Sequence, residues 1–284
     1  MFRAASYAVV IALLGGAAAA CRHVPEIAAG ALLHPARRTK LPVRPNHCKD
    51  REYVSAEITL RGWECSASAP RRGSIVFLHG IADNRGSAVG TILRFTSKGF
   101  DVVAYDSRAH GASDGDVCTY GYFEKADLRR VVDGLTPGPV VLIGTSLGAA
   151  VAIQAAAEDQ RISGVVAAEV FADLESVARD RAPRLLTEGM IRDAFAVAEK
   201  RGRFAVAAVS PEIAARSIRV PVLLIHGDRD AETPPNHSRR VFEALNGPRQ
   251  LLLVPGAGHN TSLHKPETWS VIDGWIDSVV KGKE

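Results

Sequence analysis

One stretch of sequence organises the rest of the chain: Val140-Val141-Leu142-Ile143-Gly144-Thr145-Ser146-Leu147-Gly148-Ala149-Ala150-Val151-Ala152. An apolar strand leads into a Gly-x-Ser-x-Gly turn, and an alanine-rich helix follows the turn. The two glycines permit a sharp turn and a close approach of strand and helix, so the serine hydroxyl projects above the edge of a sheet. We therefore predict that Ser146 is a catalytic nucleophile.

The same pattern occurs a second time, at Gly111-Ala112-Ser113-Asp114-Gly115. No apolar strand ends just before this second match, and no helical period follows it. Ser113 thus lacks the strand–turn–helix context that exposes a nucleophile. The context selects Ser146.

Strands and helices are predicted to alternate along most of the chain. Residues 53–65 have the alternation of an antiparallel edge pair, and the continuous apolar run at 74–80 is typical of a strand buried on both faces of a parallel sheet. Further strands are predicted at 101–105, 140–143, 164–168, 220–227 and 250–254, and helices at 125–135, 146–157 and 266–280. Repeated strand–helix–strand units require a mostly parallel central sheet flanked by helices, so the predicted fold class is α/β.

The chain length suits a single catalytic domain. With 284 residues, 46% of them hydrophobic, the chain can bury one substantial core, which we assign to residues 53–284. Residues of about 172–219 interrupt the alternation with a broadly helical insertion of mixed charge, which we predict to be a small lid.

The N-terminus has the composition of an export signal. Arg3 precedes an almost wholly apolar or small stretch, Ala4 to Ala20, and we assign residues 1–20 to a signal peptide or an uncleaved signal anchor. Small residues followed by Cys21 resemble a bacterial lipoprotein cleavage site, although position 18 is Ala where that pattern usually has Leu. Lipidation of Cys21 and ordinary cleavage near Ala20 both stay open.

A basic segment follows the signal. Residues 22–51 hold seven Lys or Arg and two acidic residues, while the net charge of the whole chain is only +4. The excess positive charge therefore belongs to a tail, and no nucleic-acid-binding face is expected. Because residues 21–52 contain four prolines, we expect them to form an irregular linker. This linker is either free in solution or lies near anionic lipid. We expect the protein to be exported to the cell envelope, where it is either associated with the membrane through its N-terminus or periplasmic or extracellular.

Cysteine usage is consistent with export. Four cysteines allow three pairings, and lipidation of Cys21 would leave Cys48, Cys65 and Cys118 for one disulfide and one thiol. We favour a disulfide between Cys48 and Cys65. No metal-spaced set of His and Cys is present in the sequence, so we expect no metal site.

Several motifs together resemble those of the α/β-hydrolase family, over roughly residues 53–282. They are His79-Gly80, the run from Asp106 to Ser113, Gly144-Thr145-Ser146-Leu147-Gly148, His226-Gly227-Asp228-Arg229-Asp230 and Gly256-Ala257-Gly258-His259. Their order, with the nucleophile first, an acid next and a histidine last, is the order that this fold requires. The resemblance implies an α/β-hydrolase fold with a small helical lid.

The resemblance also assigns the partners of Ser146. A serine hydroxyl needs an imidazole to take its proton, and His259 occupies the family's histidine position. Asp230 is the predicted acid that orients His259, while Asp228 more naturally braces the turn. Glu169 and Asp173, after the strand that follows Ser146, form a second-choice position for the acid.

Two backbone amides are implied as the oxyanion hole, those of Leu147 and Ile81, whose side chains have no role in it. Among the other histidines, His226 is interpreted as a packing and loop-fixing residue, and His237 is expected to be solvated.

These assignments predict a serine hydrolase that cleaves carboxylic esters or thioesters through a Ser-His-Asp triad and a covalent acyl-enzyme, with no cofactor. The expected substrate is a small-molecule or acyl-chain ester. A serine peptidase of aminopeptidase-like type is an alternative, but it needs a charged anchor for a peptide terminus, which we do not locate. A non-catalytic binding protein is the other alternative. The sequence determines neither the substrate nor the oligomeric state.

Overall fold

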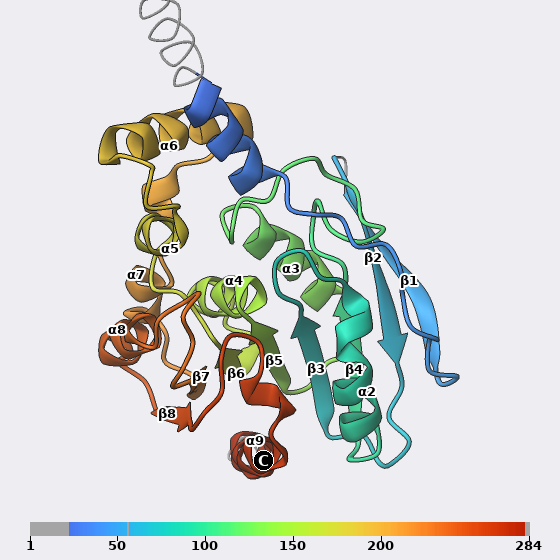
Figure 1. Ribbon diagram of the computed structural model, residues 1–284. Helices are drawn as coiled ribbons and strands as arrows, with labels where there is room; N and C mark the ends of the chain where they lie inside the picture. Colours follow the sequence, from blue (N-terminus) through green and yellow to red (C-terminus); the bar gives the residue numbers. More distant parts are fainter. Residues whose placement is uncertain (1–22, 56, 282–284) are drawn as a thin grey trace, which may run out of the picture.

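The computed structural model describes residues 23–55 and 57–281. Its centre is an eight-stranded sheet with the order β1-β2-β4-β3-β5-β6-β7-β8 (Figure 1). The strands are β1 (Cys48–Val54), β2 (Thr59–Cys65), β3 (Gly73–Leu78), β4 (Phe100–Tyr105), β5 (Val140–Thr145), β6 (Ile162–Ala168), β7 (Val222–Gly227) and β8 (Arg249–Val254).

The sheet is mostly parallel, which confirms the predicted fold class. Strands β4, β3, β5, β6, β7 and β8 pair in parallel, and β2 pairs antiparallel with both β1 and β4. All residues of β3 and β7 are buried, as continuous apolar strands require. Strand β1 begins at Cys48, so the first strand takes up the end of the segment that we expected to be a linker.

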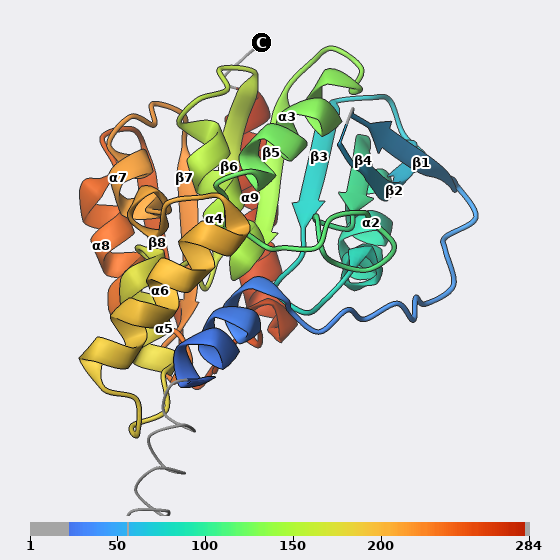
Figure 2. The ribbon, with the colours of Figure 1, turned by 90° about the horizontal axis from the view of Figure 1, so that it is seen from above.

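Helices cover both faces of the sheet (Figures 1 and 2). One hydrophobic cluster joins the sheet to α3, α4, α7 and α8, and a second joins its other face to α2 and α9. The helices of the domain are α2 (Val89–Thr96), α3 (Glu124–Asp133), α4 (Leu147–Ala156), α5 (Leu174–Arg181), α6 (Glu188–Gly202), α7 (Pro211–Ala215), α8 (Asn236–Ala244) and α9 (Pro266–Lys281).

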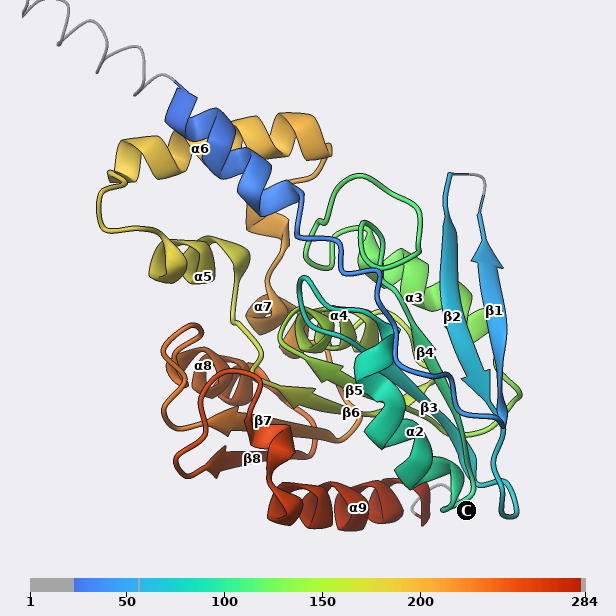
Figure 3. The same cartoon turned by 45° about the vertical axis from the view of Figure 1, so that its right-hand side comes forward.

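The segment predicted as a lid contains α5, α6 and α7. Helices α5 and α6 stand away from the sheet (Figure 3), whereas α7 packs against α4 and α8 in the body of the domain. Of the predicted lid, only α5 and α6 therefore stand apart from the body of the domain, and the name lid is kept below for these two helices.

The expected irregular linker is wrong for residues 23–33, which form a helix. This helix lies across α6 (Figure 3), and its Ala29 and Leu33 are fully buried. Pro25 stands near the start of the described helical residues and Pro35 beyond their end, so the residues between them contain no helix-breaking proline.

The structure confirms the disulfide between Cys48 and Cys65, which face each other in the register of β1 and β2. Cys118 is a buried free thiol. The predicted signal segment 1–20 and Cys21 lie outside the described residues. Within the described part of the chain, no helix combines the length and apolarity needed to cross a membrane.

Candidate active site

Ser146 occupies a strained turn between β5 and α4. Its φ of 49° and ψ of −110° are unusual for a residue other than glycine. The close packing around the turn requires its two glycines: a Cβ on Gly144 would lie 2.4 Å from the carbonyl oxygen of Gly148, and one on Gly148 would lie 2.2 Å from that of Leu78. The structure therefore has the predicted strand–turn–helix arrangement around Ser146.

His259 and Asp230 come from the loops after β8 and β7. The Nε2 atom of His259 lies 3.1 Å from the Oγ atom of Ser146, and its Nδ1 atom lies 2.7 Å from Oδ2 of Asp230. The carboxyl ends of β5, β7 and β8 meet at one edge of the parallel sheet, which brings the three side chains together. Both histidine contacts are within hydrogen-bond distance.

Asp230 is buried, and several donors surround its carboxylate. Oδ1 accepts hydrogen bonds of 2.9 Å from the amides of both Glu232 and Thr233. Burial alone would raise the pKa of Asp230, but the hydrogen bonds from His226, His259 and the Thr233 amide outweigh burial and hold the pKa well below its usual range. Asp230 is thus a stable anion beside His259.

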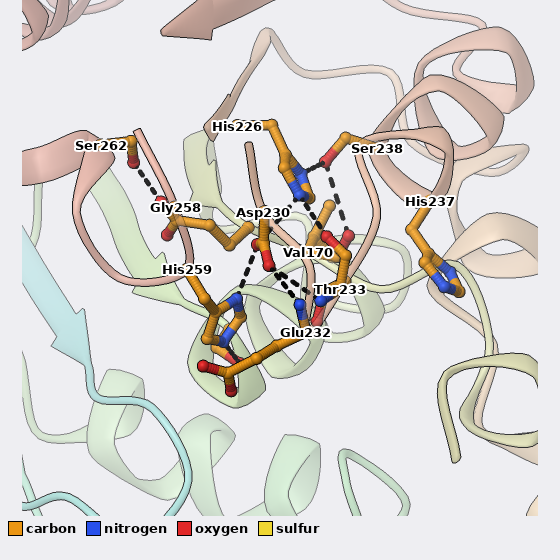
Figure 4. Close-up of polar contacts among 12 residues, drawn as sticks. Val170, His226, Asp230, Glu232, Thr233, His237, Ser238, Gly258, His259 and Ser262 are labelled. Carbon is orange, nitrogen blue, oxygen red and sulfur yellow. Dashed lines mark hydrogen bonds and ion pairs between the residues drawn. The ribbon is translucent and has the colours of Figure 1, made fainter. Parts of the chain in front are cut away.

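His226 has a closer connection to the site than its sequence interpretation implied. Its Nε2 atom lies 3.2 Å from Oδ2 of Asp230 and 2.8 Å from the carbonyl oxygen of Thr233 (Figure 4). Because both neighbours are acceptors, Nε2 carries a proton. The Nδ1 atom lies 2.6 Å from the hydroxyl of Ser238, which fixes the ring on its other side. The interpretation as a loop-fixing residue is therefore correct but incomplete.

The two residues predicted to supply the oxyanion hole belong to segments next to Ser146: Leu147 follows it in the chain, and Ile81 follows Gly80 in the loop after β3. Leu147 is the first residue of α4, so its N–H has no carbonyl partner one turn earlier in the helix. Gly80, which precedes Ile81, packs against the nucleophile: a Cβ on Gly80 would lie 3.7 Å from that of Ser146. His79 fixes this loop, because its Nδ1 donates to the carbonyl of Gly80 and its Nε2 accepts from the amide of Ser107.

The alternative residues have other roles in the structure. Asp228 accepts a 2.7 Å hydrogen bond from the amide of Gly256 and so braces the turn. Ser113 donates to the carbonyl of Asp106 and accepts from the amide of Arg61, which makes it a buried structural residue. Asp173 caps α5 through the amide of Ser176.

Glu169 is buried near the site without contacting His259 by a hydrogen bond. It accepts a hydrogen bond from Ser262, while its second oxygen has no partner among the described residues. Burial raises the pKa of Glu169, against the opposing effects of Ser262 and the two neighbouring histidines, His259 and His226.

His237 is the one histidine whose predicted environment is wrong. We expected it to be solvated, but it is only 3% exposed. Its Nδ1 accepts from the amide of Ala172, and its Nε2 lies 2.9 Å from Asp180 of α5. The strand-end context gave no signal for this contact, because it forms between the lid and α8.

A pocket of about 640 Å³ is lined by residues that neighbour Ser146 and His259 in the sequence. These residues include Gly80 and Ile81 from the loop after β3, Thr145 before the serine, and Asn260 after His259. The buried carboxyl of Glu169 also lines this pocket. Its volume lies in the range of small-molecule sites. Among residues 23–55 and 57–281, no group of three or more His, Cys, Asp or Glu is placed to hold a metal ion.

Comparisons with known proteins show the family of the chain. Residues 75–269 match the model of the alpha/beta hydrolase family. The uncharacterized protein YqkD of Bacillus subtilis is 30% identical over 202 residues, which cover 68% of this chain and 66% of YqkD. The human alpha/beta hydrolase domain-containing protein 17B is 29% identical over 69% of this chain and 62% of its own length. These two matches thus span just under two thirds of each relative.

Among solved structures, the Pyrococcus furiosus esterase Pf2001 superposes with a TM-score of 0.66 at 24% identity. The superposition covers 87% of this chain and 98% of that esterase. At this level of identity the likeness concerns the fold.

Proposed function

Since the chain belongs to the alpha/beta hydrolase family, we propose that it is a serine hydrolase that cleaves carboxylic esters or thioesters through Ser146, His259 and Asp230. The observation that carries the proposal is the continuous series of contacts from the Ser146 hydroxyl through both ring nitrogens of His259 to the Asp230 carboxylate. A nucleophile, a base and a group that orients the base are the parts that such a reaction needs.

The proposed reaction has two halves. In the first, His259 Nε2 takes the proton of Ser146 as Oγ attacks the substrate carbonyl, and the same nitrogen then gives the proton to the departing alcohol or thiol. In the second, water attacks the acyl-enzyme with His259 again as base, and the acid product leaves. Asp230 keeps the His259 tautomer that presents Nε2 to the serine and stabilises the imidazolium.

Negative charge develops on the substrate oxygen in both halves. The amides of Leu147 and Ile81 are the proposed donors to this oxygen, and each such donor contributes about 3 kcal/mol to transition-state stabilisation. These side chains and amides complete the proposed chemistry without a cofactor. The adjoining pocket has room for a small or medium-sized part of the ester.

Labelling with a fluorophosphonate probe tests the proposal. The purified wild-type protein should be labelled, Ser146→Ala should not, and Ser113→Ala should be labelled like the wild type. A folded wild type that stays unlabelled would favour a binding protein without activity. Labelling that survives Ser146→Ala and disappears in Ser113→Ala would move the nucleophile to the other Gly-x-Ser-x-Gly turn.

The substrate class is tested with p-nitrophenyl esters of increasing chain length beside aminoacyl amides. Turnover of the esters is expected. If only the amides were hydrolysed, the protein would be a peptidase and not an esterase.

A further inference from the structure

Arg181, the last residue of α5, reaches from the lid to the active site. Its Nε donates to the carbonyl of Glu232 at 3.1 Å, and its Nη2 donates to the hydroxyl of Thr233 at 2.7 Å. The same Nη2 lies 3.4 Å from Nε2 of His259. A guanidinium from the lid thus lies against the ring nitrogen that faces Ser146.

The charge of Arg181 is not neutralised within the described part of the chain. None of the described carboxylates lies within 4.0 Å of its guanidinium nitrogens. Two nearby arginines are paired: Arg179 with Glu175 and Glu188, and Arg240 with Asp173 and Glu212. Arg181 differs from them in that its three contacts are all to neutral groups of the site.

This position has a consequence for the proposed reaction. His259 becomes positively charged when it takes the proton of Ser146, and two positive charges at such a distance repel each other. An anion bound to Arg181 would offset this repulsion. Guanidinium groups bind carboxylates and phosphates through paired N–H donors, and Nη1 of Arg181 has no protein partner among the described residues.

The geometry also indicates which part of the substrate faces Arg181. His259 Nε2 is the atom that passes the proton to the leaving group. Since Nη2 of Arg181 lies next to this atom, the guanidinium faces the leaving alcohol or thiol and not the acyl group.

We propose that Arg181 is a specificity-determining residue that binds a carboxylate or phosphate on the leaving group, so that the substrates are esters or thioesters of anionic alcohols or thiols. This inference rests on the proposed serine hydrolase function. It names a substrate class that the fold alone does not define.

Binding to the Ser146→Ala variant tests the inference without turnover. The probes are acetoxyacetate, 3-acetoxypropanoate and 4-acetoxybutanoate, each compared with its neutral primary amide, and 2-acetoxyethyl phosphate as the phosphate probe. Calorimetry should give an affinity for at least one anionic probe about 10- to 100-fold higher than for its neutral partner, the range expected for a hydrogen bond to a charged group.

Variants at position 181 connect the preference to this side chain. In the Ser146→Ala background, Arg181→Gln should remove the preference and Arg181→Lys should retain part of it. Arg184→Gln is the matched control, because Arg184 is an exposed lid arginine with no contact to the site, and it should retain all of it. If Arg181→Gln does not fold, the Lys variant decides: a preference for the anionic over the neutral probe that is unchanged, or that is lost completely, contradicts the inference.

Several results would overturn the inference. They are equal affinities for anionic and neutral probes, a preference that persists in Arg181→Gln, and a preference only for anions on the acyl side, as in monomethyl succinate against its monoamide. A purely structural role of Arg181 would lower both affinities equally and leave their ratio unchanged. Failure of fluorophosphonate labelling with the anion preference intact would remove the proposed hydrolase function and leave Arg181 as an anion-binding residue.

Discussion

The Nε2 atom of His226 lies 3.2 Å from Oδ2 of Asp230, the same carboxylate oxygen that contacts His259. Two histidines therefore contact one oxygen of the Asp230 carboxylate, and two backbone amides donate to the other. Such a set of donors fixes both the position and the charge of the carboxylate.

We expect His226→Gln to reduce kcat about 10- to 100-fold, because Asp230 loses one charged hydrogen bond that holds it toward His259. KM for a p-nitrophenyl ester should change little, since His226 is fully buried and does not contact the substrate pocket. Ser238→Ala, which removes the contact behind the ring, should have a smaller effect in the same direction. A His226→Gln variant with unchanged kcat would show that the amides of Glu232 and Thr233 suffice.

Asp230→Asn and Asp228→Asn should differ sharply. The first variant loses the carboxylate that orients His259, and we expect kcat to fall by about 10⁴-fold. The second loses only the brace to the Gly256 amide and should keep most of the activity. Steady-state kinetics of both variants, with circular dichroism to check folding, would contradict the assignment of the acid if their activities were comparable.

Glu169→Gln should change the pH dependence of stability and not the activity. Burial raises the folded-state pKa of Glu169 above its ordinary value of 4.5, so its contribution to stability is fully present below that pH and is lost as the pH rises through the folded-state pKa. The glutamine variant carries no ionisable group there. The free energy of unfolding of the variant minus that of the wild type should therefore be larger at pH 8 than at pH 4.

Urea unfolding of both proteins at the two pH values measures this difference. Glu243→Gln, an exposed carboxylate on α8, is the control and should leave the difference near zero. A loss of activity in Glu169→Gln comparable to that in Asp230→Asn would instead support Glu169 as the acid.

The strand ends explain why so much of the candidate site could be predicted from sequence. Ser146, Asp230 and His259 each follow an apolar run, and parallel strands present their carboxyl ends at one edge. Fold class and the relative positions of these residues thus follow from local patterns. The glycines of the elbow add a local signal of the same kind.

Other features depend on packing between distant segments, which local patterns do not encode. Arg181 reaches His259 only through the placement of α5, and His237 of α8 contacts Asp180 of the same helix. The helix at 23–33 is stabilised by its packing on the lid and on the loop around Cys118. The sequence pattern of residues 23–33 does not indicate that they pack on these two segments.

Replacing both Cys48 and Cys65 by Ala should lower stability by about 3 kcal/mol, the loop-closure contribution for a sequence separation of 17 residues. The disulfide joins β1 to β2 at one edge of the sheet, whereas the loops that carry Asp230 and His259 follow β7 and β8 near the other edge. Denaturant unfolding should detect the loss, while kcat on a p-nitrophenyl ester should not change. A parallel loss of kcat would show that the edge pair shapes the site.

The N-terminal helix at 23–33 would connect a membrane anchor at the N-terminus to the lid. Arg201 of α6 pairs with Glu26 at 3.7 Å, and the amide of Cys118 donates to the carbonyl of Leu33, so the helix is fixed to both the lid and the domain. Cys21 lies shortly before this helix in the sequence. We propose that Cys21 is lipidated, which would hold the lid close to the membrane surface.

Cell fractionation of the wild type and of Cys21→Ser tests this attachment. We expect wild-type protein in the membrane fraction of the cell envelope, with the mass of a lipid on the mature N-terminus, and Cys21→Ser without that lipid. Wild-type protein found only in the cytoplasm would contradict export, and a Cys21→Ser variant that is cleaved yet still membrane-bound would contradict lipidation. Purified Cys21→Ser should retain full esterase activity, because the triad and its donors all lie within the described domain and none involves this cysteine.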